Sequence, residues 1–203
     1  MKWSRAVHHV ESLARTCAEM ATRPSSIFPL RVVQLWATGE VLGTPRELDV
    51  VTVALSVDLP VEDVPWRSDP PGAQHWANAT RLDRSPVIAR WRSVHAPIWN
   101  HEIRRPVLLW DSTDGVAEDA IAALREGHGD KVGLAEPTPE LLRARVDDEL
   151  AVSLRSLRER TRDYEERRWR PGKLGPIADA LWQAGDGYLD LLDAMPDLAP
   201  DPG

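Results

Sequence analysis

Cysteine is almost absent from this 203-residue chain, and the single thiol, Cys17, excludes two classes of structure. One cysteine cannot form an internal disulfide, and it cannot supply the several thiolates of a structural zinc site. Because Cys17 falls on the apolar stripe of the first predicted helix, we expect a small buried side chain there and not a nucleophile.

Long apolar runs are also missing. No segment approaches the roughly 20 residues that cross a bilayer, and His8, His9 and Glu11 interrupt the region where a secretory signal needs an apolar stretch. We therefore expect a cytoplasmic protein with no membrane partner. The net charge of -7 comes mainly from residues 107–203, which hold 21 acidic and 12 basic side chains. This excess argues against nucleic acid as a partner.

The apolar pattern predicts an α+β fold in which a small mixed sheet is flanked by helices. Residues 3–21 repeat apolar side chains every three or four positions, as a helix with one buried face does. Residues 30–36, 48–59 and 106–110 are rich in β-branched and aliphatic side chains, and each predicts a strand. A further helix is predicted at residues 116–125.

The C-terminal part predicts two long helices. Thr138 and Pro139 are typical of an N-cap and a first helical position, and an apolar stripe then continues to Trp169. A second stripe covers residues 174–195, and the short link between the helices predicts antiparallel packing. The expected domains are an α/β core of 1–136, a helical pair of 137–196 packed on that core, and a disordered tail of 197–203.

Residues 60–106 are rich in tryptophan and arginine, and two interpretations stay open. Trp66, Trp76, Trp91 and Trp99 lie among many arginines and could stack on bases or on a planar ligand. The alternative is structural, because an indole that buries roughly 150–250 Å² pins a loop onto a core. The only regular element predicted here is a short helix that starts at Ser85 and Pro86.

The stretch from Leu30 to Leu59 combines a strand, a glycine turn, an acid and a second strand. This order resembles the nucleotidyltransferase superfamily, whose signature is an apolar strand, a Gly-Ser turn and a second strand with two acids. The resemblance implies a nucleotidyltransferase-like core. It also implies a nucleotide ligand at Gly39, Gly43 and Thr44, with Asp49 as the first metal ligand.

The same stretch departs from the family pattern at two positions. Glu40 stands where the family has serine, and its charge would repel a phosphate. Val51 stands at the second acidic position, which leaves Asp111, after the third strand, as the other candidate ligand for Mg²⁺. We expect a degenerate site with no bound cofactor and no assignable catalytic residue; Mg²⁺ is expected only if the site is intact.

A plainer interpretation of the candidate residues also stays open. Asp49 would then be a polar residue at a strand edge, Asp111 a turn or cap residue, and the segment from Gly39 to Thr44 an ordinary turn. As a whole, the chain also resembles an uncharacterised actinobacterial family, in stretches such as PPGAQHWANATRL and YEERRWRPGKLGPIADALW.

Three functional hypotheses follow. The first is a degenerate nucleotidyltransferase-like protein with a binding or regulatory role. The second is an active Mg²⁺-dependent nucleotidyltransferase. The third is an interaction protein that contacts a partner, or a second copy of itself, through the C-terminal helices.

Overall fold

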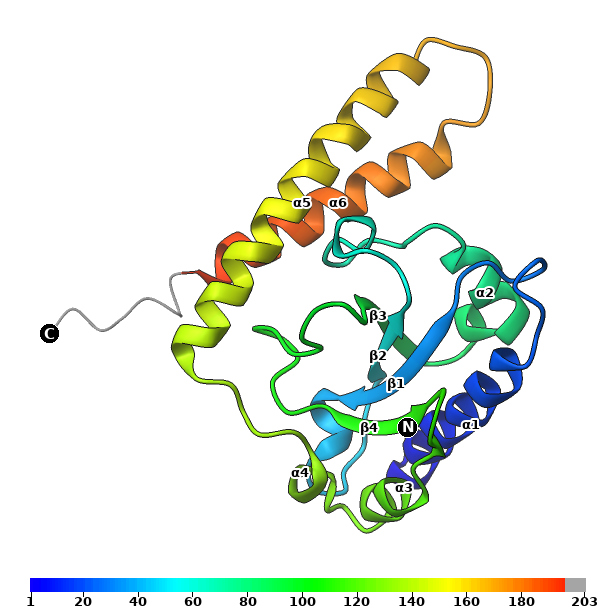
Figure 1. The fold of residues 1–203 in the computed structure, drawn as a ribbon, viewed down its shortest axis with the longest axis vertical. Coiled ribbons are helices and arrows are strands. Elements are labelled where there is room, and N and C mark those ends of the chain that lie inside the picture. The colour runs from blue at the N-terminus through cyan, green and yellow to red at the C-terminus, as the bar shows by residue number, and fades with distance from the viewer. Residues whose placement is uncertain (196–203) are drawn as a thin grey trace, which may run out of the picture.

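A computed structural model describes residues 1–195 of the chain. A five-stranded mixed sheet forms its centre, in the order β3-β2-β1-β4-β5 (Figure 1). The strands are β1 (Val32–Thr38), β2 (Val51–Val57), β3 (Val87–Ser93), β4 (Val107–Asp111) and β5 (Gly115–Val116). Only β2 and β3 run parallel, and the other neighbours are antiparallel. The α+β class and the mixed sheet are therefore confirmed.

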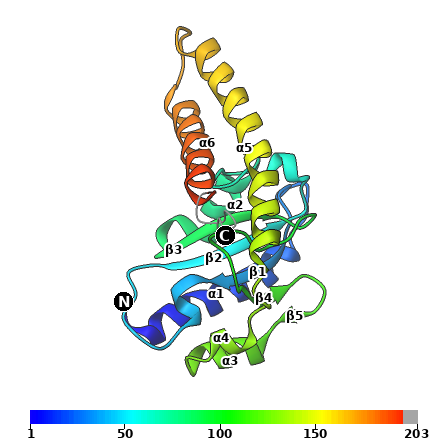
Figure 2. The ribbon, with the colours of Figure 1, turned by 90° about the vertical axis from the view of Figure 1, so that its left-hand side faces the viewer.

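Six α-helices accompany the sheet in the described part of the chain. They are α1 (Trp3–Ala21), α2 (Ala73–Thr80), α3 (Glu118–Arg125), α4 (Gly129–Val132), α5 (Pro139–Arg167) and α6 (Gly175–Ala194). The helices α1 and α3 lie on one side of the sheet and the pair α5 and α6 on the other (Figure 2). None of the helices described here has the length and apolar composition that spanning a membrane requires.

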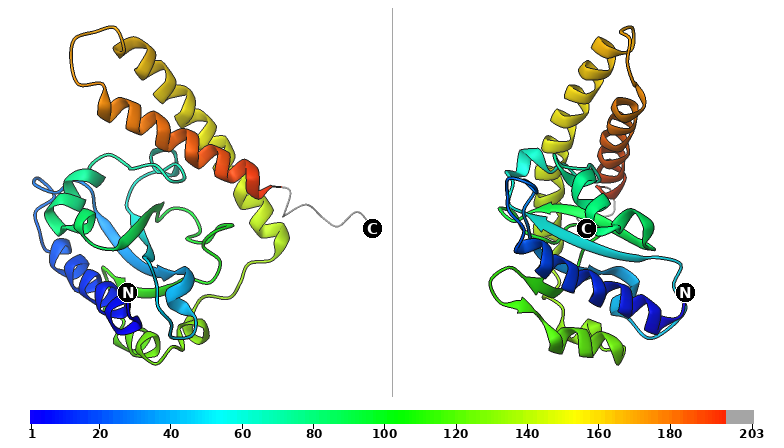
Figure 3. Two further views of the ribbon diagram at one scale, coloured as in Figure 1. Left: turned by 180° about the vertical axis from the view of Figure 1, so that it is seen from behind. Right: turned by 90° about the vertical axis from the view of Figure 1, so that its right-hand side faces the viewer.

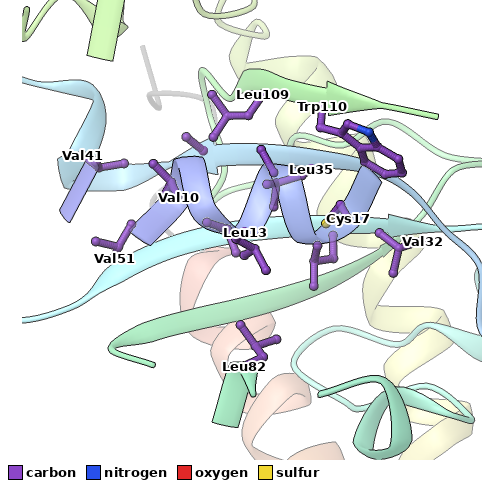
Figure 4. Packing of buried hydrophobic residues seen from close by; sticks show 14 of the residues in the cluster. Val10, Leu13, Cys17, Val32, Leu35, Val41, Val51, Leu82, Leu109 and Trp110 are labelled. Atoms are coloured by element: carbon purple, nitrogen blue, oxygen red, sulfur yellow. The ribbon is translucent and has the colours of Figure 1, made fainter. Parts of the chain in front are cut away.

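The α1 side of the sheet is an apolar core. Val10, Leu13 and Cys17 of α1 pack against strand residues such as Leu35, and all of these side chains are buried (Figure 4). Burying one such side chain contributes roughly 1.5–3 kcal/mol. Burial also raises the pKa of the Cys17 thiol, which agrees with the predicted structural role of this residue.

The helices α5 and α6 form an antiparallel hairpin that extends beyond the body of the protein (Figures 1 and 3). The hydroxyl of Thr138 caps α5 by accepting a hydrogen bond from the Leu141 amide at 3.4 Å. Both predicted helices and their antiparallel arrangement are therefore confirmed. The predicted division after residue 136 stays a prediction, and the tail predicted to be disordered lies outside the described residues.

One element was predicted wrongly. Residues after Ser85 and Pro86 do not form a short helix: Val87–Ser93 is strand β3, paired with β2 from Val51↔Val87 to Val57↔Ser93. The β-branched Val87 and Ile88 favour a strand, and the parallel partner overrides the helix-start signal. The α-helix of this region is α2, upstream of Ser85, and two short 3₁₀ helices lie at Val61–Asp63 and Leu82–Arg84.

Candidate functional site

The predicted nucleotide turn is a surface turn. Gly39 opens a short 3₁₀ helix, Gly39–Leu42, with φ of +69°, and Gly43 ends that helix. Glu40 in the same turn is ion-paired with Arg46 at 2.9 Å, and both side chains are more than half exposed. The structure therefore brings Gly39, Gly43 and Thr44 together, while nucleotide binding there stays a prediction. A nucleotide-dependent rise in melting temperature would test it.

The two predicted metal ligands lie near opposite ends of the sheet. Asp111 is level with Gln34 of β1, which in turn is level with Ser56 near the end of β2. Val51 begins β2 five residues earlier, about 16 Å away at 3.3 Å per residue, and Asp49 lies beyond it. A single Mg²⁺ ion cannot be shared over that distance, because its ligands lie about 2.1 Å from the metal.

The carboxylate of Asp111 stabilises the turn after β4. Its carboxylate accepts hydrogen bonds from Gln34 Nε2 at 2.9 Å and from the Thr113 amide at 2.7 Å. Burial alone would raise the pKa of Asp111, but these hydrogen bonds outweigh it and lower the pKa. Asp49 is exposed. Within residues 1–195, no three His, Cys, Asp or Glu side chains are placed so that they could hold a metal ion.

The tryptophans of residues 60–106 take mainly the structural role. Trp66 and Trp76 are each 2% exposed and Trp91 is 6% exposed, and Trp76 meets Trp91 edge to face at 5.8 Å. A groove of about 220 Å³ runs beside Trp91, between α2 and β3, and is smaller than the roughly 300–1,000 Å³ of ligand pockets. These three indoles are therefore not available for stacking on bases, and the fourth, Trp99, is half-buried and packs against the apolar cluster that contains Trp66.

The second face of the sheet carries a buried charge cluster that the sequence pattern did not predict. Glu149 of α5 accepts hydrogen bonds from Arg92 of β3 at 2.5 Å and from Asn100 Nδ2 at 3.0 Å, and Arg145 Nε lies 3.0 Å from it. Burial would raise the pKa of Glu149, but the two arginines outweigh it and lower the pKa. This cluster fixes α5 to the sheet. Its members lie far apart in the sequence, so no local sequence pattern predicts it.

A second cluster holds α6. Asp190 accepts hydrogen bonds from Trp66 Nε1 at 2.6 Å and is paired with Arg67 at 2.8 Å and with His101 at 2.8 Å. The inner face of α6 comes so close that a Cβ on Gly187 would lie 2.1 Å from the Trp66 carbonyl oxygen. Ala184 and Leu191 are buried on the same inner face.

The opposite face of α6 is apolar and exposed. Trp182 is 69% exposed, Leu189 is 58% exposed and Leu192 is 39% exposed. With Gly185, where an added Cβ would meet nothing within 4 Å, they repeat at spacings of three and four, so they lie on one helix face. We call Trp182, Gly185, Leu189 and Leu192 the outer stripe. Contiguous exposed apolar patches of more than a few hundred Å² are typical of interaction sites.

Residues 1–197 match a protein-family model described as a domain of unknown function (DUF7711). The match covers nearly the whole chain and so confirms the predicted uncharacterised family, while the actinobacterial origin and the nucleotidyltransferase resemblance stay predictions. No curated protein and no solved structure matches the chain.

Proposed function

Since the chain belongs to the DUF7711 family, whose function is unknown, we propose its function from the structure: it is an interaction protein that binds a helix of a partner protein on the outer stripe of α6. The observation that carries the proposal is the exposure of Trp182 and Leu189 on a helix whose inner face is held to the body by Asp190 and Gly187. A helix fixed in this way presents its outer face without rearrangement.

The form of the stripe favours a helix as the occupant. Spacings of three and four produce a narrow ridge that matches the groove between side chains of a second helix. Gly185 lies at the centre of the ridge, between Trp182 and Leu189, and its missing side chain lets a second backbone come close. Trp182 is the expected hot spot, because tryptophan is enriched among residues that dominate binding energy.

A designed peptide tests the proposal. The probe is a 21-residue helical peptide with a leucine stripe and only glutamine on its edges, labelled for fluorescence polarisation. We expect it to bind the full chain, and we expect Trp182→Ala to weaken binding by about thirtyfold or more, since a hot-spot truncation costs about 2 kcal/mol or more. Trp182 is exposed, so the free energy of unfolding should change by less than about 0.5 kcal/mol.

Trp169 provides the matched control. This indole is 81% exposed and lies after the end of α5, outside the outer stripe. Trp169→Ala removes the same side chain from the same hairpin, and we expect peptide binding to stay as in the parent chain. No binding to the parent chain, or equal losses in the two variants, would refute the proposal.

A further inference from the structure

We infer that the partner helix carries arginine or lysine along one edge of its apolar face; the inference rests on the proposed function. The charge of α6 points to this chemistry. Gly175–Ala194 contains four charged side chains, and all four are aspartates: Asp179, Asp186, Asp190 and Asp193. The charged side chains that α6 itself presents to a docked helix are therefore all acidic.

The aspartates are concentrated on one side of the outer stripe. Asp179, Asp186 and Asp193 follow each other at intervals of seven residues, which is nearly two turns, so they share one edge of the helix. At 100° per residue this edge begins directly beside Trp182 and Leu189. We call these three aspartates the acidic edge.

The acidic edge is only partly neutralised by the protein itself. Asp186 lies 3.3 Å from Arg67, but that guanidinium is also paired with Glu102 and Asp190. Asp179 and Asp193 are exposed, and no cation of residues 1–195 forms an ion pair with either of them. Arginine or lysine on a partner would meet carboxylates that lie open to solvent.

A second copy of the chain would match the outer stripe in apolar character, but its acidic edge would repel the acidic edge of the first copy. A two-fold axis at Gly185 would place Leu192 opposite Ala178 and Leu189 near Trp182, so apolar side chains would meet. The same axis would bring Asp186 beside its own copy. It would also bring Asp179 of one copy close to Asp193 of the other, because the two residues would differ in height by only about 3 Å along the helix axis. Like charges facing each other across an interface are unfavourable, whereas cations on the partner make all three meetings attractive.

The test compares two labelled peptides with the same leucine stripe, one with arginine edges and one with glutamate edges. We expect the arginine peptide to bind the full chain at least tenfold more tightly at low salt, and the difference to shrink in 0.5 M salt as the charges are screened. In the double variant Asp179→Asn, Asp193→Asn we expect the two peptides to bind within threefold of each other.

The control removes two charges elsewhere on the hairpin. Glu165 and Glu166 are exposed near the end of α5, and the double variant Glu165→Gln, Glu166→Gln should keep the full preference for the arginine peptide. If it lost the preference equally, net charge and not the acidic edge would be responsible, and the inference would be wrong.

The remaining outcomes separate the inference from the proposed function. If both peptides bind equally and Trp182→Ala weakens both, the function stands and the inference fails. If neither charged peptide nor the glutamine peptide binds, both fail. A dimer of the chain alone in sedimentation, dispersed by Leu189→Asp, would make a second copy the occupant and overturn the inference.

Discussion

The two faces of the central sheet hold their helices by different means. On the α1 face the contacts are apolar, with Leu13 and Cys17 against Leu35. On the α5 and α6 face, apolar residues such as Trp36 and Leu191 are joined by buried charges, among them Arg92 and Glu149. Apolar contacts tolerate small shifts, whereas hydrogen-bonded charge pairs require one geometry. The hairpin is therefore held in a defined orientation, which suits a surface that presents one helix face.

The largest expected effect comes from breaking the charge cluster under α5. Glu149→Ala would leave Arg92, 3% exposed, and Arg145, 9% exposed, as buried cations without their carboxylate. We expect the free energy of unfolding in urea to fall by about 3–5 kcal/mol, the usual cost of removing one partner of a buried pair. Glu159→Ala, at an exposed position of the same helix, should change it by less than about 0.5 kcal/mol.

A triple variant sharpens the comparison of the two faces. Replacing Arg92, Arg145 and Glu149 together by leucine or methionine removes the three charges of the cluster. The buried Asn100 loses its acceptor on Glu149 but keeps its hydrogen bonds from the amides of Glu102 and Ile103. We expect much of the lost stability to return, because packed apolar residues often replace a buried ion pair at little cost. If the triple variant were as unstable as Glu149→Ala, burial of unpaired charge would not explain the single variant.

Two glycines of α6 give the next effect, smaller and of opposite sign at the two positions. At Gly187 an added Cβ would lie 2.1 Å from the Trp66 carbonyl oxygen, and at Gly185 it would meet nothing within 4 Å. We expect Gly187→Ala to destabilise the protein by about 1–3 kcal/mol, as overpacking does. Gly185→Ala should stabilise it by up to about 1 kcal/mol, because alanine favours a helix more than glycine does.

Urea denaturation of the two glycine variants, with hydrogen exchange of the α6 amides, measures this difference. Faster exchange along α6 in Gly187→Ala alone would locate the damage at the contact with Trp66. Equal effects of the two substitutions would show that helix propensity, and not the close approach of α6 to the body, decides the stability.

Periodicity in the sequence predicted the elements whose packing depends on near neighbours in the chain. The apolar stripe of residues 3–21 and the capped start at Thr138 both led to helices found within two residues of the expected ends. Strand β3 was missed because each of its residues pairs with a residue of β2 that lies 36 positions earlier in the chain, as Val87 does with Val51. Ser85 and Pro86 indicate a helix start locally, and only the parallel neighbour reverses that preference.

The candidate site was less predictable for the same physical reason. Glu149 lies among several acids in the middle of α5, and its partners Arg92 and Asn100 come from residues about 50 positions away. The outer stripe itself was visible as part of an apolar helix, but the sequence could not tell its inner face from its outer face. A glycine in a helix interior often marks a close contact, but Gly185 and Gly187 give the same signal on opposite faces of α6, and only Gly187 lies at such a contact.

The smallest effect concerns pH and the cluster that holds α6. Burial would raise the pKa of Asp190, but hydrogen bonds from His101 and Trp66, together with the charge of Arg67, outweigh it and lower the pKa. A carboxylate whose pKa is lowered by folding contributes stability above its unfolded pKa of about 3.9, and loses that contribution as pH falls through the folded value. We therefore expect Asp190→Asn to be less stable than the parent chain at pH 7. This difference in the free energy of unfolding should shrink steadily below about pH 4.

Urea denaturation at a series of pH values measures this difference. Asp193→Asn, which changes an exposed carboxylate on the same helix, is the control and should show no comparable difference at either end of the series. A difference between the parent chain and Asp190→Asn that stayed constant down to pH 3 would mean that the charge of Asp190 does not hold α6, and that the two faces of the sheet differ less than their side chains suggest.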